Sequence, residues 1–130
     1  MKRIQYIPGD LVYIPKFGNN YTIMSSGKYY YEALDANYND VVIECTDIVP
    51  IPITPEILDK NKWKRLKTKR YTWWKARFDS VHYFIKPNKD YPSVWELCRG
   101  KTKHRFKKIR YVHQLQHFLF GLDLNSNMKL

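Results

Sequence analysis

Cysteine is scarce in this sequence, and its spacing supports neither a disulfide framework nor a metal site. The chain of 130 residues has two cysteines, Cys45 and Cys98, which lie 53 positions apart and form no CxxC motif. Disulfide-rich folds and zinc sites both need more cysteines at closer spacing. We therefore expect two reduced thiols that are at least partly buried, as in a cytoplasmic protein.

Long apolar segments are also lacking. No window of eighteen residues is apolar throughout, so the sequence predicts no membrane-spanning helix. The N-terminal segment MKRIQYIPGD contains basic side chains but no apolar stretch of the kind found in a secretory signal. We expect a cytoplasmic protein that does not associate with membranes.

The familiar sequence signatures of enzymes are missing too. The chain has no P-loop, no GxGxxG motif and no GxSxG motif, and its acidic pairs have no catalytic spacing. His113 and His117 have the spacing of a metal-binding pair, but Gln114 stands where zinc proteases have glutamate, and no third ligand is indicated. We predict a protein that is not an enzyme, with no catalytic residues, no metal and no cofactor. One alternative stays open, a magnesium-dependent nuclease whose carboxylates would be Asp35, Asp40, Glu44 and Asp47.

Acidic side chains are rare in the C-terminal part of the chain, so charge is strongly segregated. Residues 1–59 carry four lysines and arginines against eight aspartates and glutamates, whereas residues 60–130 carry nineteen against four. The net charges of the two segments are therefore −4 and +15, within a total of +11. A field of this kind attracts polyanions, and nucleic acid is the first candidate. We expect two surfaces of opposite potential in the folded protein.

The sequence does contain ample apolar and aromatic material for a folded domain. Hydrophobic residues make up 44% of the chain and aromatic residues 16%, which excludes ordinary disorder. Residues 1–53 have the pattern of short strands separated by turns, with a hairpin signal at 18–20 and a GDxV-like entry into the first strand at 9–12. This pattern predicts an SH3-like small antiparallel β-barrel.

Residues 54–130 are predicted to form a second, basic α+β subdomain packed with the first. Two prolines make 48–53 an extended connector rather than a central strand. Thr54 and Pro55 are typical of an N-cap and a first helical residue, so a short helix is expected to follow. Strand-like runs at 71–76, 81–86 and 94–98 then indicate a second antiparallel sheet. The predicted fold class is therefore α+β.

A C-terminal amphipathic helix is predicted for 109–121, packed on the second sheet. At 100° per residue, six side chains fall within an arc of about 120°, which is typical of a helix with one buried face: Tyr111, Val112, Leu115, Phe118, Leu119 and Leu122. We expect three of its apolar residues to be buried, namely Val112, Leu115 and Leu119. We expect three polar residues to be largely exposed, namely His113, Gln114 and His117.

Two basic stretches are candidates for a nucleic-acid interface. The first, 60–75, interleaves cations with tryptophans, and single-strand binders use rings to stack on bases and cations to hold phosphates. Because Trp73 and Trp74 are adjacent, on a strand they face opposite sides and at most one faces the main core. In the second stretch, 99–108, strand alternation places four cations on one face. The predicted binding residues are Lys64, Arg65, Lys67, Lys69, Arg70, Trp73, Trp74 and the four alternating cations Lys101, Lys103, Arg105 and Lys107.

Three further segments, Ile7–Val12, Ile51–Leu58 and Ile109–Gln116, occur in this order and span most of the chain. They resemble segments of small uncharacterised proteins encoded by phages, prophages and mobile elements of gut Bacteroidetes, with IPITPEIL and RYVHQLQ as the distinctive pieces. The resemblance implies such an origin, cytoplasmic residence in a bacterial host and an accessory role. That family has no established activity, so the resemblance assigns no functional residue. The basic, tryptophan-rich stretch 60–77 departs from its more neutral versions.

The sequence thus favours a non-enzymatic nucleic-acid-binding accessory protein of a phage or mobile element, with DNA or RNA as its partner. The alternative is a protein–protein adaptor or inhibitor whose basic half meets an acidic partner. In that case the basic strand is a solvated edge that prevents aggregation, and the tryptophans belong to the core. Salt-sensitive retention of nucleic acid separates the two hypotheses.

Overall fold

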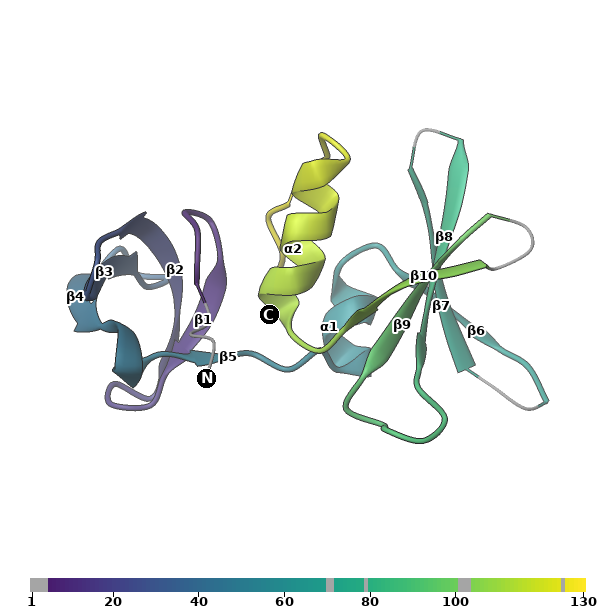
Figure 1. The fold of residues 1–130 in the computed structure, drawn as a ribbon, viewed down its shortest axis with the longest axis horizontal. Helices are drawn as coiled ribbons and strands as arrows, with labels where there is room; N and C mark the ends of the chain where they lie inside the picture. Colours follow the sequence, from purple (N-terminus) through teal and green to yellow (C-terminus); the bar gives the residue numbers. More distant parts are fainter. Residues whose placement is uncertain (1–4, 70–71, 79, 101–103, 125) are drawn as a thin grey trace. The chain divides into compact units, whose positions relative to one another are not determined.

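The computed structural model describes residues 5–69, 72–78, 80–100, 104–124 and 126–130 (Figure 1). The chain divides into two compact units. The first unit is Met1–Ile51 with Tyr111–Asn127, and the second is Pro52–Arg110 with Met128–Leu130. This division differs from the expected 1–53 and 54–130, because the segment after residue 110 returns to the first unit.

The two units have opposite net charges. The first contains four lysines and arginines against seven aspartates and glutamates, a net charge of −3. The second contains nineteen against five, a net charge of +14. The segregation seen along the sequence is therefore kept between the folded units.

A five-stranded antiparallel sheet forms most of the first unit. Its strands lie in the order β4-β3-β2-β1-β5, and among the described residues no pairing joins β4 to β5. A closed SH3-like barrel is therefore not shown. The elements of this unit are β1 (Leu11–Ile14), β2 (Asn19–Ser26), β3 (Tyr30–Leu34), β4 (Asp40–Glu44), the 3₁₀ helix η1 (Cys45–Asp47), β5 (Val49–Pro50) and α2 (Val112–Gly121).

Turn and edge residues explain the strand boundaries in this unit. Gly18 has a φ of 66°, a conformation that glycine adopts without strain, and it lies in the turn between β1 and β2. Pro50 pairs with Val12 at the edge of the sheet, where the missing backbone donor disturbs no further strand. The core beneath the sheet includes Val12, Ile14 and Ile23, none of which is exposed.

Helix α2 belongs to the first unit, where it contacts β1, so the prediction that it packs on the second sheet is not confirmed. It is also more deeply buried than its apolar arc indicates. Val112 and Leu115 are fully buried and Leu119 is 6% exposed, as predicted. The prediction that His113 is largely exposed is wrong, since only 4% of it is accessible. The rings of Tyr6 and Tyr111 lie 5.1 and 5.8 Å from the imidazole, so aromatic side chains cover it. Gln114 and His117 are partly buried, so the prediction that they are largely exposed is not confirmed for them either.

The second unit contains another five-stranded antiparallel sheet and a short helix. Its strands run in the order β10-β9-β8-β7-β6, so each pairs with its neighbour in sequence. The helix begins as predicted, with the Thr54 hydroxyl accepting from the Ile57 N–H at 3.3 Å and Pro55 in the first turn. The elements are α1 (Pro55–Lys60), β6 (Lys64–Lys67), β7 (Thr72–Phe78), β8 (Val81–Pro87), β9 (Trp95–Arg99) and β10 (His104–Ile109).

One face of this sheet forms the interior of the second unit, and we call it the inner face. Trp74 and Trp95 lie on it with ring centroids 5.4 Å apart, and both are at most 5% exposed. Trp74 Nε1 donates to Asp59 of α1 at 3.0 Å, which places the helix against this face. The fully buried residues here include Leu58, Ile85 and Leu97.

Candidate nucleic-acid interface

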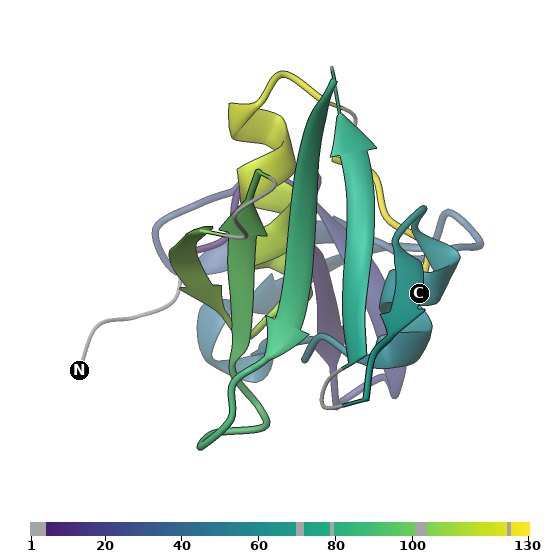
Figure 2. The same cartoon turned by 90° about the vertical axis from the view of Figure 1, so that its right-hand side faces the viewer.

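The opposite face of the second sheet, which we call the outer face, combines cations with aromatic rings. The strand register defines it, because side chains alternate between the two faces and cross-strand partners share one face. Figure 2 looks onto this sheet, with its five strands side by side. The outer face carries Lys64 and Leu66 of β6, Trp73, Lys75 and Arg77 of β7, His82, Phe84 and Lys86 of β8, Glu96 and Cys98 of β9, and Arg105 and Lys108 of β10.

Two aromatic rings form the centre of the outer face. Trp73 and Phe84 pack edge to face, with ring centroids 6.1 Å apart and an interplanar angle of 86°. With Cys98 and the partly buried Leu66 they make a small apolar cluster that is separate from the core of the first unit. Trp73 is 9% exposed and Phe84 is 7% exposed, so other side chains cover both rings.

Lysine side chains supply part of this cover. The Lys86 ammonium lies 4.7 Å from the Trp73 ring centroid, and the Lys75 ammonium lies 5.9 Å from that of Phe84. These are cation–π contacts, in which the apolar lysine stem also shields the ring from water. A lysine of this kind can move without disturbing the backbone. Flexible cations therefore form part of the cover of both rings.

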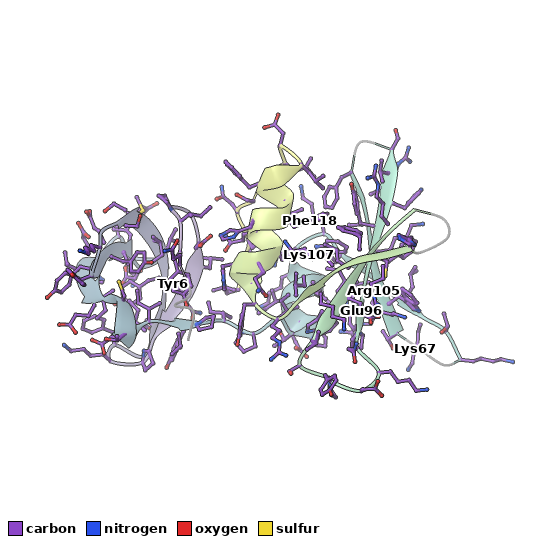
Figure 3. All side chains as sticks on the ribbon, in the orientation of Figure 1. Tyr6, Lys67, Glu96, Arg105, Lys107 and Phe118 are labelled. Carbon is purple, nitrogen blue, oxygen red and sulfur yellow. The ribbon has the colours of Figure 1, made fainter. Side chains whose placement is uncertain are left out.

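Glu96 is the one carboxylate on the described strands of this sheet, and it is only 7% exposed. Its Oε1 accepts from Arg105 Nη1 at 2.9 Å and from Asn88 Nδ2 at 3.1 Å, and its Oε2 lies 3.5 Å from Lys86 Nζ. Figure 3 shows the labelled side chains of Glu96 and Arg105 close together. Burial raises the pKa of Glu96, but the bond from Arg105 and the charges of Lys86 and Arg105 outweigh it and hold the pKa below its ordinary value.

The structure brings together some of the predicted binding residues and separates others. Lys64, Trp73 and Arg105 share the outer face. Another group belongs to the inner face, where the Arg65 guanidinium lies 5.2 Å from the Trp74 ring and pairs with Asp59. The members of that group are Arg65, Lys67, Trp74 and Lys107. Lys69 is exposed after β6, and Arg70, Lys101 and Lys103 lie outside the described residues.

The two tryptophans do face opposite sides of β7, as predicted. Trp74 lies in the interior with Trp95, whereas Trp73 lies on the outer face with Phe84. The hydrogen bond from Trp74 to Asp59 and the cation–π contact from Arg65 give this residue a structural role. Of the two rings, Trp73 is therefore the one on the outer face.

The expected single row of cations on β10 is wrong for the two residues that can be compared. Arg105 pairs with Cys98 and Lys107 with Leu97, so the register shifts between them. A β-bulge puts one extra residue, Phe106, into the strand, and this breaks the alternation that would have kept both cations on one face. Arg105 thus joins Glu96 on the outer face, while Lys107 pairs on the inner one.

Sequence reasoning missed several residues of the outer face. Phe84, Lys86, Glu96 and Lys108 were not among the predicted binding residues, and Lys75 was noted only as part of the first basic stretch. Alternation along 81–86 separates Phe84 and Lys86 from their neighbours, but it does not say which face binds. The cross-strand register that brings Lys86 beside Glu96 is a tertiary property.

The chain matches no protein-family model, and comparisons with curated proteins and with solved structures find no significant match. Over the described ranges, no helix is long and apolar enough to cross a membrane. In the same ranges, no three histidine, cysteine, aspartate or glutamate side chains gather in a way that would hold a metal ion.

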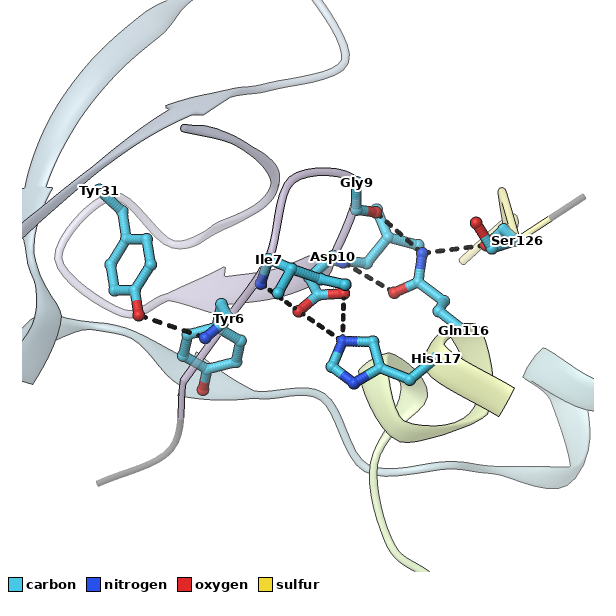
Figure 4. A network of polar contacts seen from close by, with 9 residues as sticks. Tyr6, Ile7, Gly9, Asp10, Tyr31, Gln116, His117 and Ser126 are labelled. Carbon is cyan, nitrogen blue, oxygen red and sulfur yellow. Dashed lines mark hydrogen bonds and ion pairs between the residues drawn. The ribbon is translucent and has the colours of Figure 1, made fainter. Parts of the chain in front are cut away.

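A separate polar network lies inside the first unit (Figure 4). Asp10, 2% exposed, accepts from the Ile7 N–H at 2.8 Å and contacts His117 Nε2 through both oxygens, at 2.8 and 3.0 Å. Gln116 accepts from the Leu11 N–H at 2.9 Å and donates to the Gly9 carbonyl, also at 2.9 Å. Burial raises the pKa of Asp10, although its bonds from Ile7 and His117 offset part of this effect. The network fixes α2 to the start of β1.

The first unit is expected to lose stability in mild acid because of His113. Burial, and secondarily the charge of His117, lowers the pKa of His113 from 6.5 to about 4. Since the unfolded chain takes up this proton first, stability falls as the pH drops from about 6.5 toward 4, by about 1.4 kcal/mol per pH unit. We expect a loss of about 2 kcal/mol between pH 7 and pH 5, measured by urea unfolding followed by far-UV circular dichroism.

His113→Leu is the control for this pH effect. Nδ1 of His113 is buried without a hydrogen-bond partner among the described residues, so an apolar replacement leaves no new unsatisfied group there. The variant should show a flatter stability profile between pH 7 and pH 5. The raised pKa of Asp10 has the opposite effect on stability, because the folded state binds that proton more tightly than the unfolded chain does. This effect is present in both the wild type and the variant. An unchanged slope in the variant would mean that another group controls the acid response.

Proposed function

We propose that the protein is a non-enzymatic nucleic-acid-binding protein and that the outer face of its second unit is the binding surface. The observation that carries the proposal is the pair of aromatic rings, Trp73 and Phe84, which pack edge to face among cations on one face of a sheet. Rings of this kind stack on bases, while the cations neutralise phosphates. The accessory role in a phage or mobile element is part of the proposal and rests on the resemblance of the three sequence segments.

The charge of the second unit supports this choice of partner. Its net charge is +14, and the outer face has six lysines and arginines against one glutamate, Glu96. Two of the six, Lys86 and Arg105, are paired with Glu96, while Lys64 and Lys108 are exposed. A surface with this excess of positive charge attracts a polyanion from a distance and holds it in a salt-dependent way.

An acidic protein partner is the second candidate, and the same positive charge favours it. The aromatic pair does not discriminate between the two partners, because rings under flexible lysines fit unpaired bases as well as apolar side chains. The decisive experiment is filter binding of the wild-type protein to DNA and RNA at several salt concentrations. Four to six neutralised phosphates give a log–log salt slope of about −3 to −5, at roughly 0.7–0.9 per phosphate. No retention of either polymer at low salt would leave the adaptor hypothesis ahead.

Trp73→Ala is expected to weaken the binding of single strands by about 1–3 kcal/mol, because it removes a stacking ring. Binding to duplex DNA should change much less, since its bases are already stacked on one another. Tyr91→Ala, in the exposed loop before β9, is the control, since it removes an aromatic ring that is 67% exposed and outside the outer face. Fluorescence anisotropy with labelled oligonucleotides measures both variants. Equal losses for single and double strands would contradict a stacking role.

The SH3-like barrel also remains a proposal for the first unit. The support for it is the antiparallel order of five short strands and the turn at Gly9, whose φ is 94°, leading into β1. Closure would need pairing between β4 and β5, which amide hydrogen exchange or cross-strand nuclear Overhauser effects would detect.

A further inference from the structure

Glu96 lies at the point where the cations of the outer face converge. The residue directly opposite it on β8 is Lys86, and the residue directly opposite it on β10 is Lys108. Arg105, from the other side of the bulge in β10, donates to the same carboxylate at 2.9 Å. Three cations from the two strands that flank β9 thus surround one anionic side chain.

We propose that Glu96 takes the place of a phosphate in the unbound protein, and that the ligand of the outer face is single-stranded nucleic acid, which displaces this carboxylate from Lys86 and Arg105. The inference rests on the proposed function and adds to it the class of nucleic acid and a residue that sets affinity. Glu96 and a backbone phosphate each carry one negative charge and present two oxygens to hydrogen-bond donors. They can therefore exchange on the same cations.

Lys86 couples this exchange to the aromatic rings. Its ammonium contacts both the Glu96 carboxylate, at 3.5 Å, and the face of Trp73, at 4.7 Å. A lysine that turns toward a phosphate leaves both of these partners together. The face of Trp73 that Lys86 covers, in a residue only 9% exposed, then becomes more accessible to a base. A single movement of the Lys86 side chain therefore both captures a phosphate and uncovers the stacking surface.

This coupling favours single strands over duplexes. A duplex offers phosphates but keeps its bases stacked inside, so it can use the cations and gains nothing from the uncovered Trp73. A single strand offers a phosphate and an adjacent unstacked base. When its base stacks on Trp73, a single strand therefore recovers the free energy that is lost with the contact between Lys86 and Trp73.

The test is the substitution Glu96→Gln, compared with Glu56→Gln. Both variants lose one negative charge from the second unit, but Glu56 is exposed in the first turn of α1, the helix that packs on the inner face. Binding to a labelled oligo-dT and to a duplex is measured by anisotropy at several salt concentrations. Glu96→Gln is expected to bind oligo-dT about tenfold more tightly at 50 mM salt and to steepen the salt slope by roughly 0.7 per cation released. Glu56→Gln should change affinity by less than about twofold, because an exposed charge outside the site is screened by salt.

The outcomes separate this inference from the proposed function. Absence of binding by the wild type overturns both, whereas binding by the wild type without tightening in Glu96→Gln overturns the displacement alone. Equal affinity of the wild type for oligo-dT and the duplex overturns the preference for single strands. Because loss of a buried carboxylate can impair folding, circular dichroism is recorded first. Glu96→Asp serves as the second variant, since it keeps the charge and shortens the reach to Lys86 and Arg105. It is expected to bind oligo-dT more tightly than the wild type, by less than Glu96→Gln, and no tightening in a folded Glu96→Asp also overturns the inference.

Discussion

Replacing Lys64, Lys75 and Lys108 together by glutamine is expected to weaken binding to nucleic acid by about 10²–10³-fold at 50 mM salt. The estimate follows from counterion release, which is worth about tenfold in affinity per phosphate contact at this salt concentration. The three residues lie on the outer face and come from three different strands, β6, β7 and β10. The salt slope should become shallower by about 2–3. Filter binding at 50 and 200 mM salt measures both quantities.

The matched control removes three lysines that lie elsewhere on the chain. Lys16 and Lys28 belong to the first unit, and Lys89 lies in the loop after β8, so their replacement by glutamine lowers the net charge equally. All three are exposed, and none belongs to the outer face. Binding should be weakened far less than in the outer-face variant. Similar losses in the two triple variants would show that net charge, and not the outer face, governs retention.

Leu115→Ala is expected to destabilise the first unit by about 2–5 kcal/mol, because it leaves a cavity under helix α2. Leu115 is fully buried, and the helix is also held by the bonds from Gln116 to Gly9 and from Leu11 to Gln116. All four tryptophans of the chain lie in the second unit. Tryptophan fluorescence therefore monitors only that unit, and far-UV circular dichroism must be used to follow urea unfolding of the first.

Val42→Ala is the control for this measurement. Val42 lies on β4 and is 70% exposed, so its truncation creates no cavity and should change stability by less than about 0.5 kcal/mol. A cost for Leu115→Ala that is no larger than that of Val42→Ala would show that the helix does not contribute to the core. Unchanged tryptophan fluorescence in Leu115→Ala would show that the second unit folds without the first.

Local sequence signals predicted the features that depend on neighbouring residues. The N-cap at Thr54, the proline at the first turn of α1 and the turn at Gly18 follow from backbone conformation and capping alone. The opposite placement of Trp73 and Trp74 follows from the alternation of side chains along any strand. These features need no knowledge of what packs against them.

Features that depend on distant residues were not predicted. The burial of His113 requires the ring of Tyr6, which is more than one hundred positions away in the sequence. The bulge that separates Arg105 from Lys107 appears only in the pairing of β9 with β10. Likewise, the ion pairs of Glu96 with Lys86 and Arg105 depend on which strands are neighbours. The composition of the outer face was visible in the sequence, but its arrangement was not.

The division of the chain makes residues 52–110, which form most of the second unit, an insertion within the first, since the first unit resumes at Tyr111. Hydrogen bonds hold both sides of the junction. Within the first unit the Val112 N–H donates to the Ile51 carbonyl at 2.8 Å, and within the second the Ile53 N–H donates to the Arg110 carbonyl at 3.0 Å.

During synthesis on a ribosome, α2 emerges after residues 52–110, so the first unit cannot complete its core until this insertion has been made. Closing a flexible loop of this length costs about 4 kcal/mol in chain entropy. A folded insertion that already joins Ile53 to Arg110 removes most of that cost, because the two ends of the gap are then adjacent. The course of the chain thus allows residues 52–110 to fold before α2 completes the acidic unit around their two ends.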